Sequence, residues 1–186
     1  MTQIWDISQT LRPGIPVWPG DTAYTARKTW EIGEECPVNV GSFSLSTHTG
    51  SHADAPLHYA KTGKAIADVD VRRYIGKCRL IDVPAAGRFV TPADCQAHIE
   101  QGIERILFRT YHRAPDNEWD SNFKAIAPET INLIAKFGGI LIGTDTPSLD
   151  PETSKTMDAH NAVLAHDMSI LEGLVLNDIP VGDYEL

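Results

Sequence analysis

The feature that most constrains the fold is the alternation of short apolar runs with helical patterns from residue 79 onward. Short apolar runs bounded by turn residues are typical of buried strands, whereas apolar residues three and four apart are typical of one helix face. Strands are expected at residues 80–83, 106–110, 140–143 and 174–176, and helices at residues 91–102, 128–137 and 159–166. Strands that alternate with helices predict a sheet with helices packed on it.

Two of these helices have recognisable boundaries. Thr91 is a typical N-cap residue, Pro92 suits the first helical position, and Asp94 lies three residues after the cap, which makes a near capping box. The second helix is expected to begin at Pro128 and to end at a pair of glycines, residues 138 and 139. These signals place the helices between the expected strands.

The first third of the chain is expected to be extended, at residues 4–7, 24–32 and 40–47, with turns at RPGIP and WPGD. No composition shift or repeat marks a linker in the 186 residues, so one domain spanning residues 1–186 is expected. The fold class predicted from these patterns is α/β or α+β, with a mixed sheet flanked by helices.

Charge excludes several classes of partner. The chain has 16 Lys and Arg against 25 Asp and Glu, a net charge of −9, which is the wrong sign for a broad phosphate-binding surface. We therefore expect no nucleic-acid partner and no anionic membrane partner. No apolar stretch approaches the roughly 18 residues of a membrane span, and no secretory signal is evident, so a cytoplasmic protein with three reduced cysteines is expected.

The chemistry is concentrated in the segment THTGSHADAPLHY, residues 47–59. It contains His48, His52, Asp54 and His58, all at even positions, so a mostly extended segment would direct them to one side. Imidazole and carboxylate suit zinc, and catalytic zinc sites typically use about three protein ligands with one position open. His58 is open to two interpretations, as a fourth ligand or as a free base beside the metal.

A second, weaker cluster lies in the last third of the chain: His160, His166, Asp167 and Glu172. It gains weight because the first cluster lacks an obvious ligand for a second metal. The motif GTDTPSLDP, which begins with Gly143 and contains Asp145, is more typical of turn chemistry than of a site. Dinucleotide, P-loop, zincin and α/β-hydrolase motifs are absent from the sequence.

The run HTGSHADAPLH resembles the metal signature of the cyclase family of hydrolases, H-x-G-T/S-H-x-D-x-P-x-H. The resemblance extends along the chain through WPGDTAY, GTDTPSLDP and the late His160 and Glu172, toward the formamide-hydrolysing branch of the family. It implies a swivelling β/β/α fold, a homodimer, and two divalent metal ions per subunit, most often Zn²⁺. The chain ends at VGDYEL, earlier than the family usually does, so a C-terminal truncation is expected.

The resemblance also implies a role for each site residue. Asp54 and Glu172 would bridge the two metals, and His58 would donate and accept the proton. Trp18 would contact the substrate. The implied metal ligands are His48, His52, Asp54, His160 and Glu172.

The activity implied is hydrolysis of N-formyl-L-kynurenine to L-kynurenine and formate in tryptophan degradation. Water activated by the metals would attack the formyl carbon. Two alternatives stay open: another amide or lactam hydrolase of the family, similar to isatin hydrolase, and a structural metal site in a protein that is not an enzyme.

Overall fold

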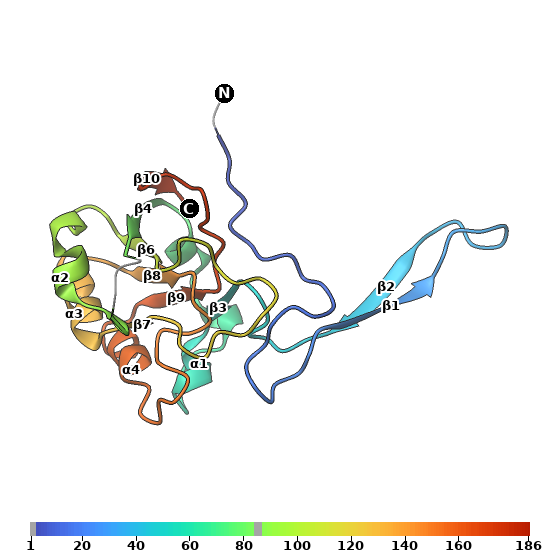
Figure 1. Ribbon diagram of the computed structural model, residues 1–186, viewed down its shortest axis with the longest axis horizontal. Coiled ribbons are helices and arrows are strands. Elements are labelled where there is room, and N and C mark those ends of the chain that lie inside the picture. Colours follow the sequence, from blue (N-terminus) through green and yellow to red (C-terminus); the bar gives the residue numbers. More distant parts are fainter. Residues whose placement is uncertain (1–2, 84–86) are drawn as a thin grey trace.

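The computed structural model describes residues 3–83 and 87–186. Its centre is a six-stranded sheet in the order β10-β4-β6-β8-β9-β3 (Figure 1). The four inner strands run parallel, and the strand at each edge is antiparallel to its neighbour, so the expected mixed sheet is present. In sheet order the strands are Gly182–Glu185, Lys77–Asp82, Arg105–Arg109, Leu141–Thr144, Ser169–Glu172 and His52–Asp54.

Three helices connect the parallel strands in turn and cover one face of the sheet (Figure 1). They are α2 (Pro92–Cys95), α3 (Pro128–Lys136) and α4 (Asp158–Ala165). A fourth short helix, α1 (Pro56–Tyr59), follows β3 and contacts α4. The remaining elements are 3₁₀ turns and a two-residue parallel pair: η1 (Ile66–Asp68), η2 (Val71–Tyr74), η3 (Gln96–His98), β5 (Phe89–Val90) and β7 (Ala125–Ile126).

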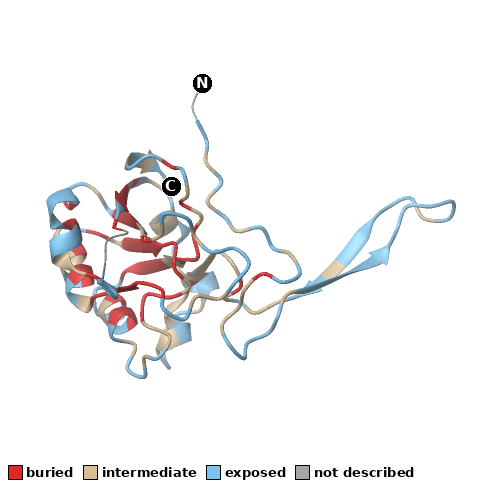
Figure 2. Cartoon of the chain, in the orientation of Figure 1, coloured by how far each residue is buried: buried red, intermediate tan, exposed pale blue. Residues whose placement is uncertain are grey.

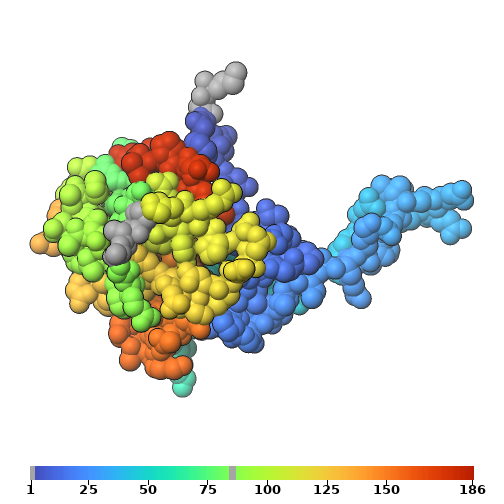
Figure 3. Space-filling model, in the orientation of Figure 1, coloured from blue at the N-terminus to red at the C-terminus, as the bar shows by residue number. Residues whose placement is uncertain are grey.

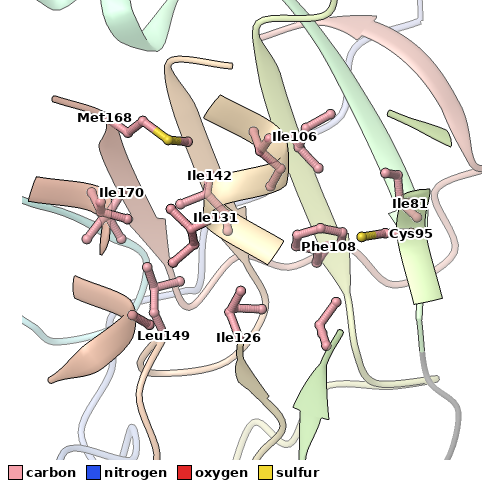
Figure 4. Close-up of a cluster of buried hydrophobic side chains, with 14 of the residues drawn as sticks. Ile81, Cys95, Ile106, Phe108, Ile126, Ile131, Ile142, Leu149, Met168 and Ile170 are labelled. Carbon is pink, nitrogen blue, oxygen red and sulfur yellow. The ribbon is translucent and has the colours of Figure 1, made fainter. Parts of the chain in front are cut away.

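Each face of the sheet has its own core because side chains alternate along a strand. On β6, Ile106 and Phe108 point to the helix-covered face, where they pack with Cys95 of α2 and Ile131 of α3 (Figure 4). Leu107 points to the opposite face. That face is covered by segments near both chain ends, whose side chains include Trp5, Ile7, Leu174, Leu176 and Ile179.

A hairpin arm projects from this body (Figures 1 and 3). It consists of β1 (Thr25–Trp30) and β2 (Val40–Ser44), which pair only with each other. Every residue of β1 is exposed, and Figure 2 shows the contrast with the buried strands of the main sheet. The two expected strands are therefore real, but they are not part of the central sheet.

Three expectations about local structure are wrong. Residues 4–7 form no strand, although the Ile7 carbonyl accepts a backbone hydrogen bond from Val175 N–H at 2.8 Å. Residues 174–176 are not a strand either, because Gly173 has φ +66° and turns the chain after β9. The helix expected at 91–102 is real at its start, where Thr91 N–H donates to the Asp94 carboxylate at 2.7 Å, but it ends at Cys95 and continues only as the 3₁₀ turn η3.

Within the part of the chain that the structure describes, no helix has the length and apolarity needed to cross a bilayer.

Candidate metal centre

The centre is built on the edge strand β3. His52 and Asp54 are two residues apart, so an extended backbone directs both side chains to the same face. In the antiparallel pair with β9, His52 lies directly opposite Glu172. Residues 120 positions apart in sequence therefore meet because of strand register.

The other two histidines of the first cluster arrive by different routes. His48 lies in the turn before β3, and His58 lies in α1, which begins at Pro56. Of residues 47–59, which were predicted to be mostly extended, only β3 forms a strand. Residues 47–51 form a turn, and a helix begins at Pro56, because proline suits the first helical position and the His58 N–H donates to the Ala55 carbonyl. The predicted gathering of the four side chains nevertheless occurs.

Asp54 is the hub of the cluster and is only 2% exposed. Its Oδ1 lies 3.0 Å from His48 Nδ1 and 3.3 Å from His52 Nε2. Its Oδ2 lies 3.3 Å from His160 Nε2 and 3.9 Å from His58 Nε2. One carboxylate thus faces two groups of imidazoles with its two oxygens.

Glu172 repeats this arrangement from β9. Its Oε2 lies 3.4 Å from His52 Nε2, and its Oε1 lies 3.6 Å from His160 Nε2. Glu172 Oε1 also accepts a hydrogen bond from the Leu149 N–H at 2.9 Å. The two carboxylates together present oxygens toward both His52 and His160.

His160 is fixed by a residue that the sequence analysis did not single out. Asp150 Oδ2 lies 2.6 Å from His160 Nδ1, and the same carboxylate accepts the backbone N–H groups of Ala159 and His160 at 3.0 Å. This leaves Nε2 of the ring toward Asp54 and Glu172. Asp150 lies within the motif GTDTPSLDP, so the signal was present in the sequence, but only the fold connects it to His160.

Two members of the second cluster lie outside the centre. His166 Nε2 lies 2.8 Å from Asn132 Oδ1, and Asp167 pairs with Arg73. Asp145 is not a ligand either: its buried carboxylate accepts hydrogen bonds from the N–H groups of Thr110 and Tyr111. Burial raises the pKa of Asp145 to about 6 despite these hydrogen bonds.

The protonation of the centre reflects its crowding. Burial alone would lower the pKa of His52, but the nearby carboxylates of Asp54 and Glu172 raise it to about 10. Burial would also lower the pKa of His160, but the carboxylates of Asp150 and Asp54 outweigh this effect and raise the pKa to about 10. Burial would raise the pKa of Asp54, yet its three histidine partners hold it well below its usual range. The ring nitrogens of His52 and His160 thus hold protons, and a metal ion would compete with these protons for the same nitrogens.

The residues present fit a divalent metal ion. Asp54 Oδ1 is buried and accepts no hydrogen bond from any described residue, which would be costly without another partner. Two groups have ligand atoms within 4.8 Å of one another: His48, Asp54 and His58 in one, and His52, Asp54 and Glu172 in the other. Nitrogen and carboxylate oxygen ligands suit zinc and similar ions.

A cavity of about 480 Å³ opens beside these ligands, and His48, His58, His160 and Glu172 are part of its wall. Trp18 lies on the same wall. Its ring is edge-on to Trp119, with centroids 5.4 Å apart and an interplanar angle of 70°. A small molecule in this cavity would therefore lie between the cluster of ligands and an aromatic side chain.

Known proteins are similar to this chain in sequence and in fold. Residues 5–151 match the family described as "Putative cyclase". The kynurenine formamidase of Maricaulis maris (strain MCS10) is 52% identical over 186 residues, which is 100% of this chain and 89% of that protein. The kynurenine formamidase of Erythrobacter litoralis (strain HTCC2594) is 53% identical over 184 residues, 99% of this chain and 84% of that protein.

Two solved structures show the same fold. A potential metal-dependent hydrolase with cyclase activity superposes with a TM-score of 0.81 at 24% identity, covering 97% of this chain and 86% of its own. Isatin hydrolase A from Labrenzia aggregata superposes with a TM-score of 0.78 at 22% identity, covering 96% of this chain and 83% of that chain. The match over residues 5–151 and the full-length identity of 52% show that this chain belongs to the cyclase family.

Proposed function

We propose that this chain is an arylformamidase that hydrolyses N-formyl-L-kynurenine to L-kynurenine and formate, a step of tryptophan degradation, within a single hydrolase domain. The observation that carries the proposal is the position of the ligand cluster on the wall of a cavity that also holds Trp18. The full-length similarity to two kynurenine formamidases supports the choice of substrate.

The proposed metal ligands are His48, His52, Asp54, His160 and Glu172. Two ions are proposed because Asp54 and Glu172 each face His52 with one oxygen and His160 with the other. Zinc is proposed from the imidazole and carboxylate ligands. When bound, such ions lower the pKa of water and polarise a carbonyl group.

His58 is the proposed proton donor and acceptor. Its side chain is 39% exposed and lies on the cavity wall, with Nε2 3.9 Å from Asp54 Oδ2. The leaving group of the reaction is an aryl amine, whose nitrogen must acquire a proton before the C–N bond breaks easily. A positioned imidazole that takes a proton from water and returns it to this nitrogen is typically worth about 10² to 10⁴ in rate.

Trp18 is proposed to orient the substrate by contact with its aryl ring. Such ring contacts are worth about 0.5–1.5 kcal/mol beyond the burial of area. Trp18 is itself held between Trp119 and Phe123, at centroid distances of 5.4 and 6.3 Å, so its orientation is fixed before a substrate arrives. A fixed ring loses little conformational freedom on binding.

A homodimer in the cytoplasm completes the proposal. The hairpin arm exposes large apolar side chains, of which Phe43 is 68% and Trp30 55% exposed. Apolar side chains grouped on an element without a core of its own are typical of an interaction surface. A second copy of the chain is the proposed partner for this surface.

The test is the rate of kynurenine formation from N-formyl-L-kynurenine by the purified protein, before chelation, after chelation and after zinc is restored. We expect hydrolysis that chelation abolishes and zinc restores. Absence of hydrolysis by folded, zinc-loaded protein would refute the substrate; a parallel assay with isatin would then test the lactam-hydrolase alternative. Folded protein that binds zinc and hydrolyses neither compound would favour a structural metal site.

A further inference from the structure

Away from the ligand cluster, the charged side chains on the described part of the cavity wall are all acidic. Among the described residues, neither Lys nor Arg lines the cavity, whereas two carboxylates outside the ligand cluster do, Asp21 and Glu152. Away from the histidines of the ligand cluster, that part of the wall therefore favours an ammonium group. The cavity therefore carries a charge preference that the metal centre and Trp18 do not explain.

Glu152 is the better placed of the two carboxylates. Asp21 is exposed, and its Oδ1 accepts the N–H of Thr22 in the turn that follows Trp18. Glu152 is half-buried, and solvent screens it less. It also lies two residues after Asp150, the residue that holds His160, so one short segment positions both the metal ligand and this carboxylate.

The Glu152 side chain is oriented by an indole. Trp119 Nε1–H donates to Glu152 Oε2 at 2.6 Å, and the Trp119 ring is edge-on to Trp18. Glu152 Oε1 accepts no hydrogen bond from the residues that the structure describes, so one oxygen is anchored and the other is available. The carboxylate is thus held beside the aromatic wall with an acceptor oxygen free.

We infer that Glu152 binds the ammonium group of the substrate's amino-acid arm, so that the site selects aryl formamides whose arm carries an ammonium group over those without one. This inference rests on the proposed function for the position of the aryl ring against Trp18. The neighbouring carboxylate then receives the ammonium group through a charge-assisted hydrogen bond, which is stronger than a neutral one. Glu152 determines specificity and takes no part in the bond-breaking step.

The test compares two substrates in one variant. Glu152→Gln removes the charge but keeps an oxygen that can accept from Trp119 Nε1–H. We expect the KM for N-formyl-L-kynurenine to rise about tenfold or more, with little change in kcat, because a charged hydrogen bond is replaced by a neutral one. The KM for formanilide, a neutral aryl formamide, should stay within about twofold, because it has no group for Glu152 to bind.

The matched control is Glu185→Gln, which makes the same charge change on β10, at the opposite edge of the sheet from β3. It should leave both substrates unchanged. If Glu152→Gln raises the KM of both substrates by the same factor, Glu152 acts only by holding Trp119, and the inference is wrong. Trp119→Phe, which keeps an aromatic ring but removes the N–H donor, should raise the KM for N-formyl-L-kynurenine less than Glu152→Gln does.

Direct binding separates failure of this inference from failure of the proposed function. Calorimetric titration with L-kynurenine, which keeps the ammonium arm, should give about tenfold weaker binding to Glu152→Gln than to the wild type. A wild type that hydrolyses no formamide but shows this difference would refute the proposed function and retain the cation site. Equal affinity of the two proteins for L-kynurenine would overturn the inference whatever the turnover.

Discussion

The hairpin arm and the metal centre are adjacent in sequence, yet they differ in how their side chains are buried. The arm, β1 and β2, pairs only with itself and exposes nearly all its residues, whereas β3, which starts eight residues after β2, joins the central sheet through β9. Asp54 on β3 is 2% exposed and Phe43 on β2 is 68% exposed. Strand formation alone therefore does not bury a side chain; packing against the rest of the protein does.

The change expected to have the largest effect is Asp54→Ala, which acts on the buried side of this comparison. It removes both oxygens that face the histidines, so bound metal and kynurenine formation should both be lost. Metal content by mass spectrometry and the hydrolysis assay measure this. Asp68→Ala, on an exposed 3₁₀ turn, is the control. Full metal content in Asp54→Ala would show that it is not a ligand.

His58→Ala separates catalysis from metal binding within the centre. We expect metal content to be retained and kcat to fall about 10²- to 10⁴-fold, since positioned proton transfer typically contributes that much. His166→Ala, which removes an exposed imidazole bonded to Asn132, should change neither quantity. Loss of metal from His58→Ala would instead make His58 a ligand, as its grouping with His48 and Asp54 allows.

Two phenylalanines compare the sheet and the arm directly. Phe108→Ala removes a fully buried ring from β6 and should lower the free energy of unfolding by about 3–5 kcal/mol. Phe43→Ala on the arm should change it by no more than about 0.5 kcal/mol in dilute monomer, because the ring is exposed. Denaturant unfolding measures both.

Sedimentation tests the arm as the dimer interface. It should show that only Phe43→Ala weakens the dimer; an unchanged dimer would argue against the arm as its interface.

The buried carboxylate of Asp145 makes the sheet region pH-sensitive in a way that the exposed arm is not. Its pKa is raised from 3.8 to about 6, so its contribution to stability is full below pH 3.8 and is lost as pH rises through 6. At about 1.36 kcal/mol per pKa unit, the loss is on the order of 3 kcal/mol. The stability difference between wild type and Asp145→Asn should decrease by this amount between pH 4 and pH 7. A constant difference would contradict the shift.

The smallest effect is expected from Asp150→Asn, which leaves every ligand of the centre in place. Hydrogen-bond partners of metal-bound histidines typically contribute about 10- to 100-fold to metal affinity. Zinc affinity, measured by competition with a chelator, should fall by that factor. Asp158→Asn, an exposed change in the first turn of α4, the helix that carries His160, should leave the zinc affinity unchanged. An unaltered affinity in Asp150→Asn would show that His160 needs no orienting partner.

Much of this arrangement could be predicted from local patterns. The even spacing of His48, His52 and Asp54 predicted that they gather, and the structure brings them together. The same argument was incomplete for His58, because the helical turn at Pro56 and not an extended chain delivers it. In the second cluster, spacing gave no means of separating the members of the centre from the two outside it. The position of His160 within α4 and the pairing of β9 with β3 decide that His160 and Glu172 reach the centre and that His166 and Asp167 do not.

The sequence by itself indicated the strands β4, β6 and β8 and the helices α3 and α4, and it supplied the imidazoles and carboxylates that metal chemistry requires. These properties depend on residues close together along the chain, through periodicity, caps and turns. Only the tertiary structure decided that β3 pairs with β9, that Asp150 holds His160, and that the arm stays outside the sheet. The physical reason is that strand pairing and buried hydrogen bonds join residues far apart in sequence. Local preferences do not determine which of these pairings buries the most apolar surface and satisfies the most polar groups.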